Sequence, residues 1–178
     1  PVRATLENFS PQAIGFFGGA YFLGFTLGCW LGVPMIRRAG HVRVFAAMTA
    51  LASAAPLLHG LWVNLGSWVA LRLLSGFCFA VLYVVIESWL NERADAASRG
   101  RIYGVYTMVN LAATTAGQMV LTLGDANGYF FFVLAAMVYC LALLPTAISA
   151  TTTPRPLTKV SLNLRSLWKN SPIAVFAV

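Results

Sequence analysis

The sequence predicts an all-α integral membrane protein, and three observations carry that prediction. First, 59% of the 178 residues are hydrophobic and only 10% are Asp, Glu, Lys or Arg, whereas a soluble domain typically carries about 25% charged residues. Second, the charges cluster in short stretches between long uncharged runs. A bilayer imposes this distribution, because an ionised side chain at its centre costs roughly 3 kcal/mol on insertion scales. Third, several apolar runs reach the length of about 20 residues that a spanning helix needs.

Five such runs are predicted to be spanning helices. Polar or glycine-containing segments separate them, including Asn64-Leu65-Gly66-Ser67 and Asp125-Ala126-Asn127-Gly128. A further apolar run begins near Pro172, and we expect the chain to be truncated at both ends. The five predicted spans run from about Gln12 to Ile36, Val44 to Val63, Trp68 to Leu90, Ile102 to Leu123 and Tyr129 to Ile148.

The basic residues predict the orientation of these helices. Ten of the 12 Lys and Arg residues lie in the connections that follow the first, third and fifth spans, while Arg3 lies on the opposite side and Arg72 within a span. By the positive-inside rule these three connections are cytoplasmic. Nucleic-acid binding is the alternative for a chain with a net charge of +7. Basic loops explain that charge better, and no groove-binding motif is present, so we expect no nucleic-acid partner.

The third predicted span carries two ionisable residues on one helical face. Arg72, Gly76, Phe79, Tyr83 and Glu87 fall within an arc of about 80°. Arg72 and Glu87 are 15 residues apart, or about 22 Å along the axis, so they cannot pair with each other. Arg72 either faces a cavity or extends to the interface near the outer end of the helix. Glu87 either faces the cavity or pairs with a loop arginine.

A polar stripe follows the fourth predicted span. Tyr103, Thr107, Asn110, Thr114 and Gln118 lie within about 80° of one another. Amide side chains are costly to expose to lipid. These residues therefore either hydrogen-bond to neighbouring helices or line a water-filled path. The fifth predicted span is apolar on all sides, as expected of a helix that faces lipid.

Small residues recur at four-residue spacing in the first predicted span, at Ala20, Gly24, Gly28 and Gly32. This pattern lets two helix backbones approach closely. It serves either tight structural packing or a contact that slides during a conformational change.

Other features are less informative. The three cysteines lie in apolar runs without paired spacing, so we interpret them as packing residues and expect neither disulfide nor metal site. His59 is expected to be an interfacial side chain at the end of the second span. No Gly-rich phosphate loop, HExxH or GxSxG motif is present, and we expect no cofactor and no enzyme activity.

Two segments resemble motifs of the major facilitator superfamily of transporters. Arg72-Leu73-Leu74-Ser75-Gly76 resembles the R-x-x-x-G motif of that family's fourth helix, whose arginine lies toward the central cavity and is associated with proton coupling. Arg37-Arg38-Ala39-Gly40-His41, followed by Arg43, resembles the D-R-x-G-R loop between its second and third helices. Further segments, such as Glu87-Ser88-Trp89-Leu90-Asn91-Glu92-Arg93, are similar to the bacterial YcaD-like branch. The chain departs from the family pattern in holding Arg37 at the motif's Asp position and in lacking the fifth-helix G-P-x-x-G-G motif.

The resemblance implies a specific architecture and activity. Residues 1–150 would form an N-terminal six-helix half-bundle lacking its first helix, 151–171 a cytoplasmic linker, and 172–178 the start of the seventh helix. The chain would belong to a secondary transporter in the cytoplasmic membrane, with the lipid bilayer, a small solute, protons and a C-terminal half as partners. The alternatives are a non-transporting membrane scaffold or sensor and a membrane-embedded enzyme. The predicted transport cavity comprises Arg72, Gly76, Tyr83, Glu87, Asn110, Thr114 and Gln118.

Overall fold

The computed structural model describes residues 2–122 and 128–148, and in these residues the chain is helical without strands. The predicted all-α fold class is therefore confirmed. The predicted linker at 151–171 and the helix start at 172–178 lie outside the described residues. The helices are α1 (Val2–Leu6), α2 (Pro11–Ala39), α3 (His41–Leu61), α4 (Leu65–Arg93), α5 (Arg99–Val120) and α6 (Phe130–Ile148).

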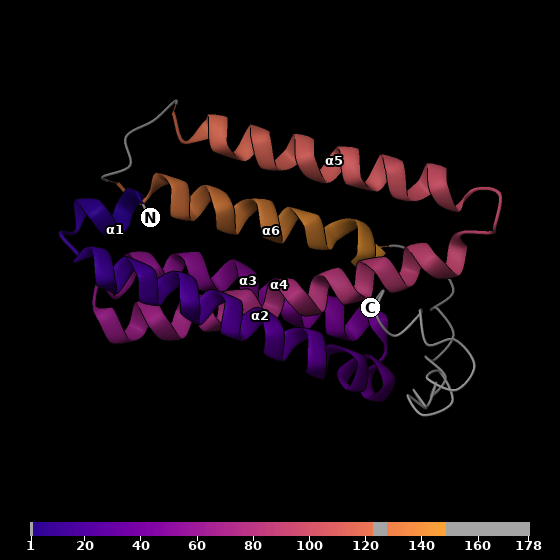
Figure 1. The fold of residues 1–178 in the computed structure, drawn as a ribbon, viewed down its shortest axis with the longest axis horizontal. Coiled ribbons are helices and arrows are strands. Elements are labelled where there is room, and N and C mark those ends of the chain that lie inside the picture. Colours follow the sequence, from indigo (N-terminus) through magenta and orange to yellow (C-terminus); the bar gives the residue numbers. More distant parts are fainter. Residues whose placement is uncertain (1, 123–127, 149–178) are drawn as a thin grey trace, which may run out of the picture.

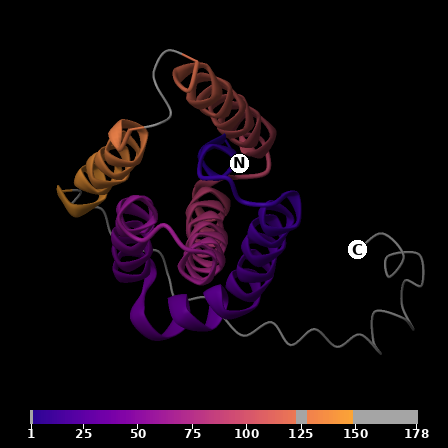
Figure 2. The same ribbon diagram turned by 90° about the vertical axis from the view of Figure 1, so that its left-hand side faces the viewer.

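The five long helices lie side by side along one axis (Figure 1). Viewed along that axis, α4 occupies the centre, with α2 and α3 on either side of it and α6 beyond α3 (Figure 2). The most extensive interface joins α2 to α4, followed by those of α3 with α6 and with α4. Helix α5 touches α4 at only a few points and buries none of its residues. The bundle therefore has a tight α2–α3–α4–α6 group and one loosely attached helix.

Capping residues set several of the helix ends. The Ser10 side chain accepts a hydrogen bond from the Ala13 backbone N–H at 3.2 Å, and Pro11 occupies the first turn of α2. The Asn64 side chain accepts one from the Ser67 N–H at 2.8 Å at the start of α4. Gly40 alone separates α2 from α3, with φ 84° and ψ 157°, a conformation that is essentially restricted to glycine.

Two groups of buried side chains hold the helices together. The larger centres on Cys78, Val81 and Val85 of α4, which are fully buried against residues of α2 and α3. The smaller lies at the α1 end, where the rings of Phe9 and Phe17 pack against Trp68 with centroids 5.1 and 5.5 Å from it. Helix α1, which the sequence analysis did not predict, closes this end by burying Ala4.

Three of the five predicted spans, α2, α3 and α4, are long and apolar enough to cross a membrane by length and composition, within the described residues. The apolar part of α6, Phe130–Thr146, is slightly short of that criterion. Helix α5 is 22 residues long, but its polar stripe lowers its hydropathy. Polar residues in a helix of spanning length need partners other than lipid.

Candidate functional site

Glycines bring the backbones of α2 and α4 into direct contact. A Cβ atom at Gly24 would lie 1.9 Å from the Leu73 carbonyl oxygen, and one at Gly76 would lie 2.0 Å from the Tyr21 carbonyl oxygen. At Gly28 the nearest atom would be the Phe77 carbonyl oxygen, at 2.6 Å. No side chain fits at these positions without separating the helices. Gly32 is buried on the same face but has ordinary clearance, its nearest neighbour being 3.6 Å away.

Arg72 lies beside this contact, in the second turn of α4. It lines a cavity of about 250 Å³ between α1, α2 and α4. Its guanidinium interacts electrostatically with Tyr21 and with His59. Within the described residues Arg72 forms no ion pair or hydrogen bond. The remaining cavity walls are Ala4, Ile14, Phe17, Gly18, Tyr21 and Trp68.

Next to Arg72, aromatic rings from three helices form a continuous group, which we call the tyrosine cluster. It contains Tyr21 and Phe25 of α2, Phe79 and Tyr83 of α4, and Tyr139 of α6. Ring centroids lie 6.5 Å apart for Tyr21 and Phe79, 6.3 Å for Phe25 and Tyr83, and 5.8 Å for Phe79 and Tyr139. The hydroxyl of Tyr139 interacts electrostatically with those of Tyr21 and Tyr83, so the three hydroxyls share one region.

Helix α5 reaches this region through one residue of the predicted polar stripe. Asn110 Nδ2 donates a long hydrogen bond, 3.5 Å, to the Tyr83 hydroxyl. Thr114 instead donates to the Asn110 carbonyl oxygen within its own helix, at 2.8 Å, and both Thr114 and Gln118 are exposed. Of the three α5 residues predicted to line the site, the structure thus brings only Asn110 to the tyrosine cluster.

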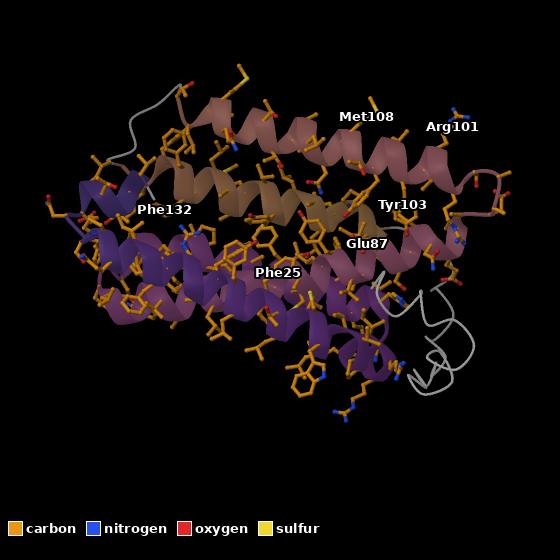
Figure 3. The ribbon with its side chains drawn as sticks, viewed as in Figure 1. Phe25, Glu87, Arg101, Tyr103, Met108 and Phe132 are labelled. Carbon is orange, nitrogen blue, oxygen red and sulfur yellow. The ribbon has the colours of Figure 1, made fainter. Side chains whose placement is uncertain are left out.

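Glu87 lies at the other end of α4, facing α5 (Figure 3). Its side chain is exposed and, in the described part of the chain, forms no ion pair with the loop arginines. Tyr103 of α5 donates to the Glu87 backbone oxygen at 3.4 Å, and the carboxylate lies near Tyr106. Among the described residues, the structure therefore does not show the predicted alternative of a pair between Glu87 and a loop arginine. The loop is held to α4 by another residue.

That residue is His41 of the predicted loop motif. It is buried, its Nε2 lies 2.9 Å from the Ser88 hydroxyl oxygen, and its ring stacks on Trp89 with centroids 6.2 Å apart. Arg37, Arg38 and Arg43 are exposed. The loop is thus fastened to α4 by a histidine, and its arginines face outward.

His59 is buried rather than interfacial, which corrects the sequence-based expectation. Only 6% of it is exposed, its Nδ1 donates to the Ala55 carbonyl at 2.8 Å, and its ring packs against Trp68. Trp68 in turn donates to the His59 carbonyl at 3.1 Å. The Nε2 atom of His59 has no hydrogen-bond partner among the described residues. The bulky Trp68 side chain covers the histidine, which could not be foreseen from its position near a helix end.

Tyr21, Phe25 and Tyr139 are central to the site, but the sequence analysis did not select them. Tyr21 and Phe25 have the i, i+4 spacing that places both on one face of α2. Tyr139 carries a hydroxyl group in the middle of a helix interpreted as lipid-facing. A polar group in such a helix could have indicated its inward face. Among the described residues, no three His, Cys, Asp or Glu side chains are grouped in a way that could hold a metal ion.

Comparison with known proteins agrees with this architecture. The family profile of the Major Facilitator Superfamily matches residues 4–178. The chain is 30% identical over 122 residues to an uncharacterised MFS-type transporter of Enterobacter sp. (strain 638), a match covering 68% of this chain and 32% of the relative. Identity and coverage are the same for the MFS-type transporter YcaD of Escherichia coli O45:K1 (strain S88 / ExPEC). No solved structure matches the chain.

The fold and its polar interior therefore define a multi-pass α-helical membrane protein of a transporter class. The chain belongs to the Major Facilitator Superfamily. Its similarity to YcaD-like transporters, anticipated from the sequence, is confirmed. The matched region spans about a third of the length of these relatives.

Proposed function

We propose that the chain forms most of the N-terminal half-bundle of a secondary transporter, which moves a small solute across the cytoplasmic membrane by alternating access. The observation that carries this proposal is the convergence of polar and aromatic groups from α2, α4, α5 and α6 around Tyr83. Polar groups inside a membrane bundle are costly unless they have partners. Of this group, only the Tyr83 hydroxyl receives a side-chain hydrogen bond, from Asn110. The others are available to a solute or to water.

The packing suggests which parts would move together. Backbone contact at Gly24 and Gly76 couples α2 to α4 as one rigid unit. Helix α5 touches α4 lightly, so changes in its position disturb few contacts. Secondary transporters rock one bundle against another around a site near the midplane. The relatives are longer than the matched region, and we propose that a second bundle of the same protein supplies the other half of the site.

Protons are the proposed coupling ion. Arg72 near one end of α4, or Glu87 near the other, would modulate the protonation of a titrating group close to it. We assign the proton-carrying group to no residue of this chain. The alternative driving force is a gradient of the solute or of another ion, and transport measurements distinguish these gradients from a proton gradient.

The test is uptake by the complete protein in sealed proteoliposomes, screened against a panel of metabolites and drugs. Asn110→Ala removes the α5 contact with Tyr83 and is expected to lower uptake at least about tenfold, because a polar group in the site loses its partner. Met108→Ala is the matched control: its side chain is 70% exposed and points away from the other helices (Figure 3). A protonophore should abolish accumulation if protons drive it.

Equal uptake by both variants would contradict the assigned position of the site. A complete protein that moves no solute in either direction, although it is folded and correctly inserted, would favour the alternative of a membrane scaffold or sensor. In that case the polar groups of α4 and α5 would serve only to hold helices together.

A further inference from the structure

The cavity beside Arg72 carries a positive charge that the described chain does not neutralise. The whole sequence has five acidic residues. Glu7 is paired with Arg3 near the N-terminus. Glu87, Glu92 and Asp95 follow Arg72 by 15 residues or more, which is about 22 Å along α4 for the nearest of them. The fifth, Asp125, lies outside the described residues.

The polar groups that remain free in this cavity can all donate hydrogen bonds. The Trp68 N–H is already used, because it donates to the His59 carbonyl. Arg72 presents up to five N–H donors in a planar fork and has no acceptor function. Tyr21 adds a hydroxyl. Such a set is complementary to a carboxylate, which accepts two parallel hydrogen bonds from one guanidinium. A cationic solute would meet an unscreened like charge there.

The walls of the same cavity are apolar. Phe17 and Trp68 contribute aromatic surfaces, and Ala4 and Ile14 contribute aliphatic ones. Its volume of about 250 Å³ is slightly below the range of roughly 300–1,000 Å³ for drug-sized ligands. The tyrosine cluster continues from it toward the middle of α4. The dimensions suit a small molecule with a flat or short apolar body.

We infer that the solute is a small organic monoanion, whose carboxylate binds Arg72 and Tyr21 while its apolar body lies against Phe17 and Trp68. This inference rests on the proposed transport function and assigns its substrate class. Two other anions compete as partners of Arg72. One is a carboxylate elsewhere in the same protein, and the other is the phosphate of a lipid.

The test compares ligands of one shape and different charge. The complete protein, purified in a neutral detergent, is titrated with benzoate, benzamide and benzylamine. Hexanoate, hexanamide and hexylamine form a second set with a flexible body. Thermal unfolding and calorimetry report binding without requiring transport. Benzoate or hexanoate should raise the unfolding temperature, and the matching amide and amine should not.

Variants then locate the binding. Arg72→Gln should raise the Kd of the anion at least about tenfold, as expected for the loss of a charge-assisted hydrogen bond. Tyr21→Phe, which keeps the ring, should raise it about two- to tenfold, the cost of one neutral hydrogen bond. Arg101→Gln is the control, because it removes one positive charge at the far end of the bundle, from a side chain that points outward (Figure 3). If Arg72→Gln does not fold, Tyr21→Phe and the ligand series still decide the question.

The outcomes separate this inference from the function on which it rests. Selective anion binding that Arg72→Gln abolishes supports the anion site at Arg72 even if proteoliposomes show no flux, in which case only the proposed transport fails. Transport of amides or amines without preference for the anion retains the transporter and overturns the inference. Absence of anion binding by the wild type also overturns it and leaves an internal carboxylate as the partner of Arg72. Anion binding that disappears only when phospholipid is added identifies lipid phosphate as the natural occupant and overturns it as well.

Discussion

The contact between α2 and α4 makes a sharp prediction about Gly24→Ala. The new Cβ would lie 1.9 Å from the Leu73 carbonyl oxygen and 2.8 Å from its carbonyl carbon. Contacts of this kind are essentially never closer than 3.0 Å, so the two backbones must separate by about 1 Å. Overpacking typically costs about 1–3 kcal/mol. The separation would also loosen the contact at Gly76, so we expect a cost near the upper end.

Gly19→Ala is the matched control, since it makes the same chemical change in the same helix. An added Cβ at Gly19 meets nothing within 4 Å, and Ala stabilises a helix interior by up to about 1 kcal/mol relative to Gly. Both variants gain this helix propensity, so they should differ in free energy of unfolding by the overpacking cost alone, about 1–3 kcal/mol. Reversible unfolding of the complete protein in bicelles measures that difference.

A second variant tests the cause. The atom that blocks Gly24→Ala belongs to the backbone, so Leu73→Ala should not restore its stability. Rescue by Leu73→Ala would mean that a side chain, and not the backbone, limits the approach of the helices. Equal stability of Gly24→Ala and Gly19→Ala would refute the close approach itself.

Three further predictions concern the connections between helices. Gly40→Ala should destabilise the protein by about 1–3 kcal/mol, because its φ of 84° and ψ of 157° are strained for any L side chain; equal thermal stability of variant and wild type would contradict this. Hydrogen bonds from Ser98 hold the pKa of Asp95 below its ordinary value, so their stabilising effect is complete above about pH 4 and lost as the pH falls through the lower native pKa. Limited proteolysis should therefore cut the connection at 94–98 faster in Asp95→Asn than in wild type at pH 7, and the two cleavage rates should be equal at a pH below the native pKa. A difference in cleavage rate that does not change with pH would argue against this role of Asp95. Single cysteines at Val63 and Ala97, in a background without the native three, should react with an impermeant thiol reagent from opposite sides of the membrane, and labelling of both from one side would overturn the orientation.

The sequence predicted each long helix, but not its bounds. The third predicted span, Trp68 to Leu90, corresponds to α4 at Leu65–Arg93. Hydropathy reports only the apolar part of a helix. At its C-terminal end α4 continues through Asn91 and Glu92, which are polar and which hydropathy therefore does not detect. Helix α1 was missed because five residues are too few to show helical periodicity.

The candidate site was predicted only in part, for a geometric reason. Periodicity groups Arg72 and Tyr83 on one face of α4, because the phase within a helix follows from residue spacing. It could not show how neighbouring helices are rotated about their own axes. Tyr21 and Tyr139 join the site through such rotations, which packing determines. The same limit explains why Thr114 and Gln118 share the stripe of Asn110 and yet remain exposed.

The single-residue turn at Gly40 between α2 and α3 limits the insertions and deletions that this part of the chain can accept. An insertion of one residue rotates everything that follows by about 100° if the helix continues. Val44, Met48 and Ala52, which now pack in the core, would then turn away from α4. Deletion would remove the one residue able to reverse the chain. Lineages that share this corner should therefore keep its length constant. Epitope tags and protease sites belong instead in the longer connection at 94–98, where added residues leave the core of α2, α3 and α4 in register.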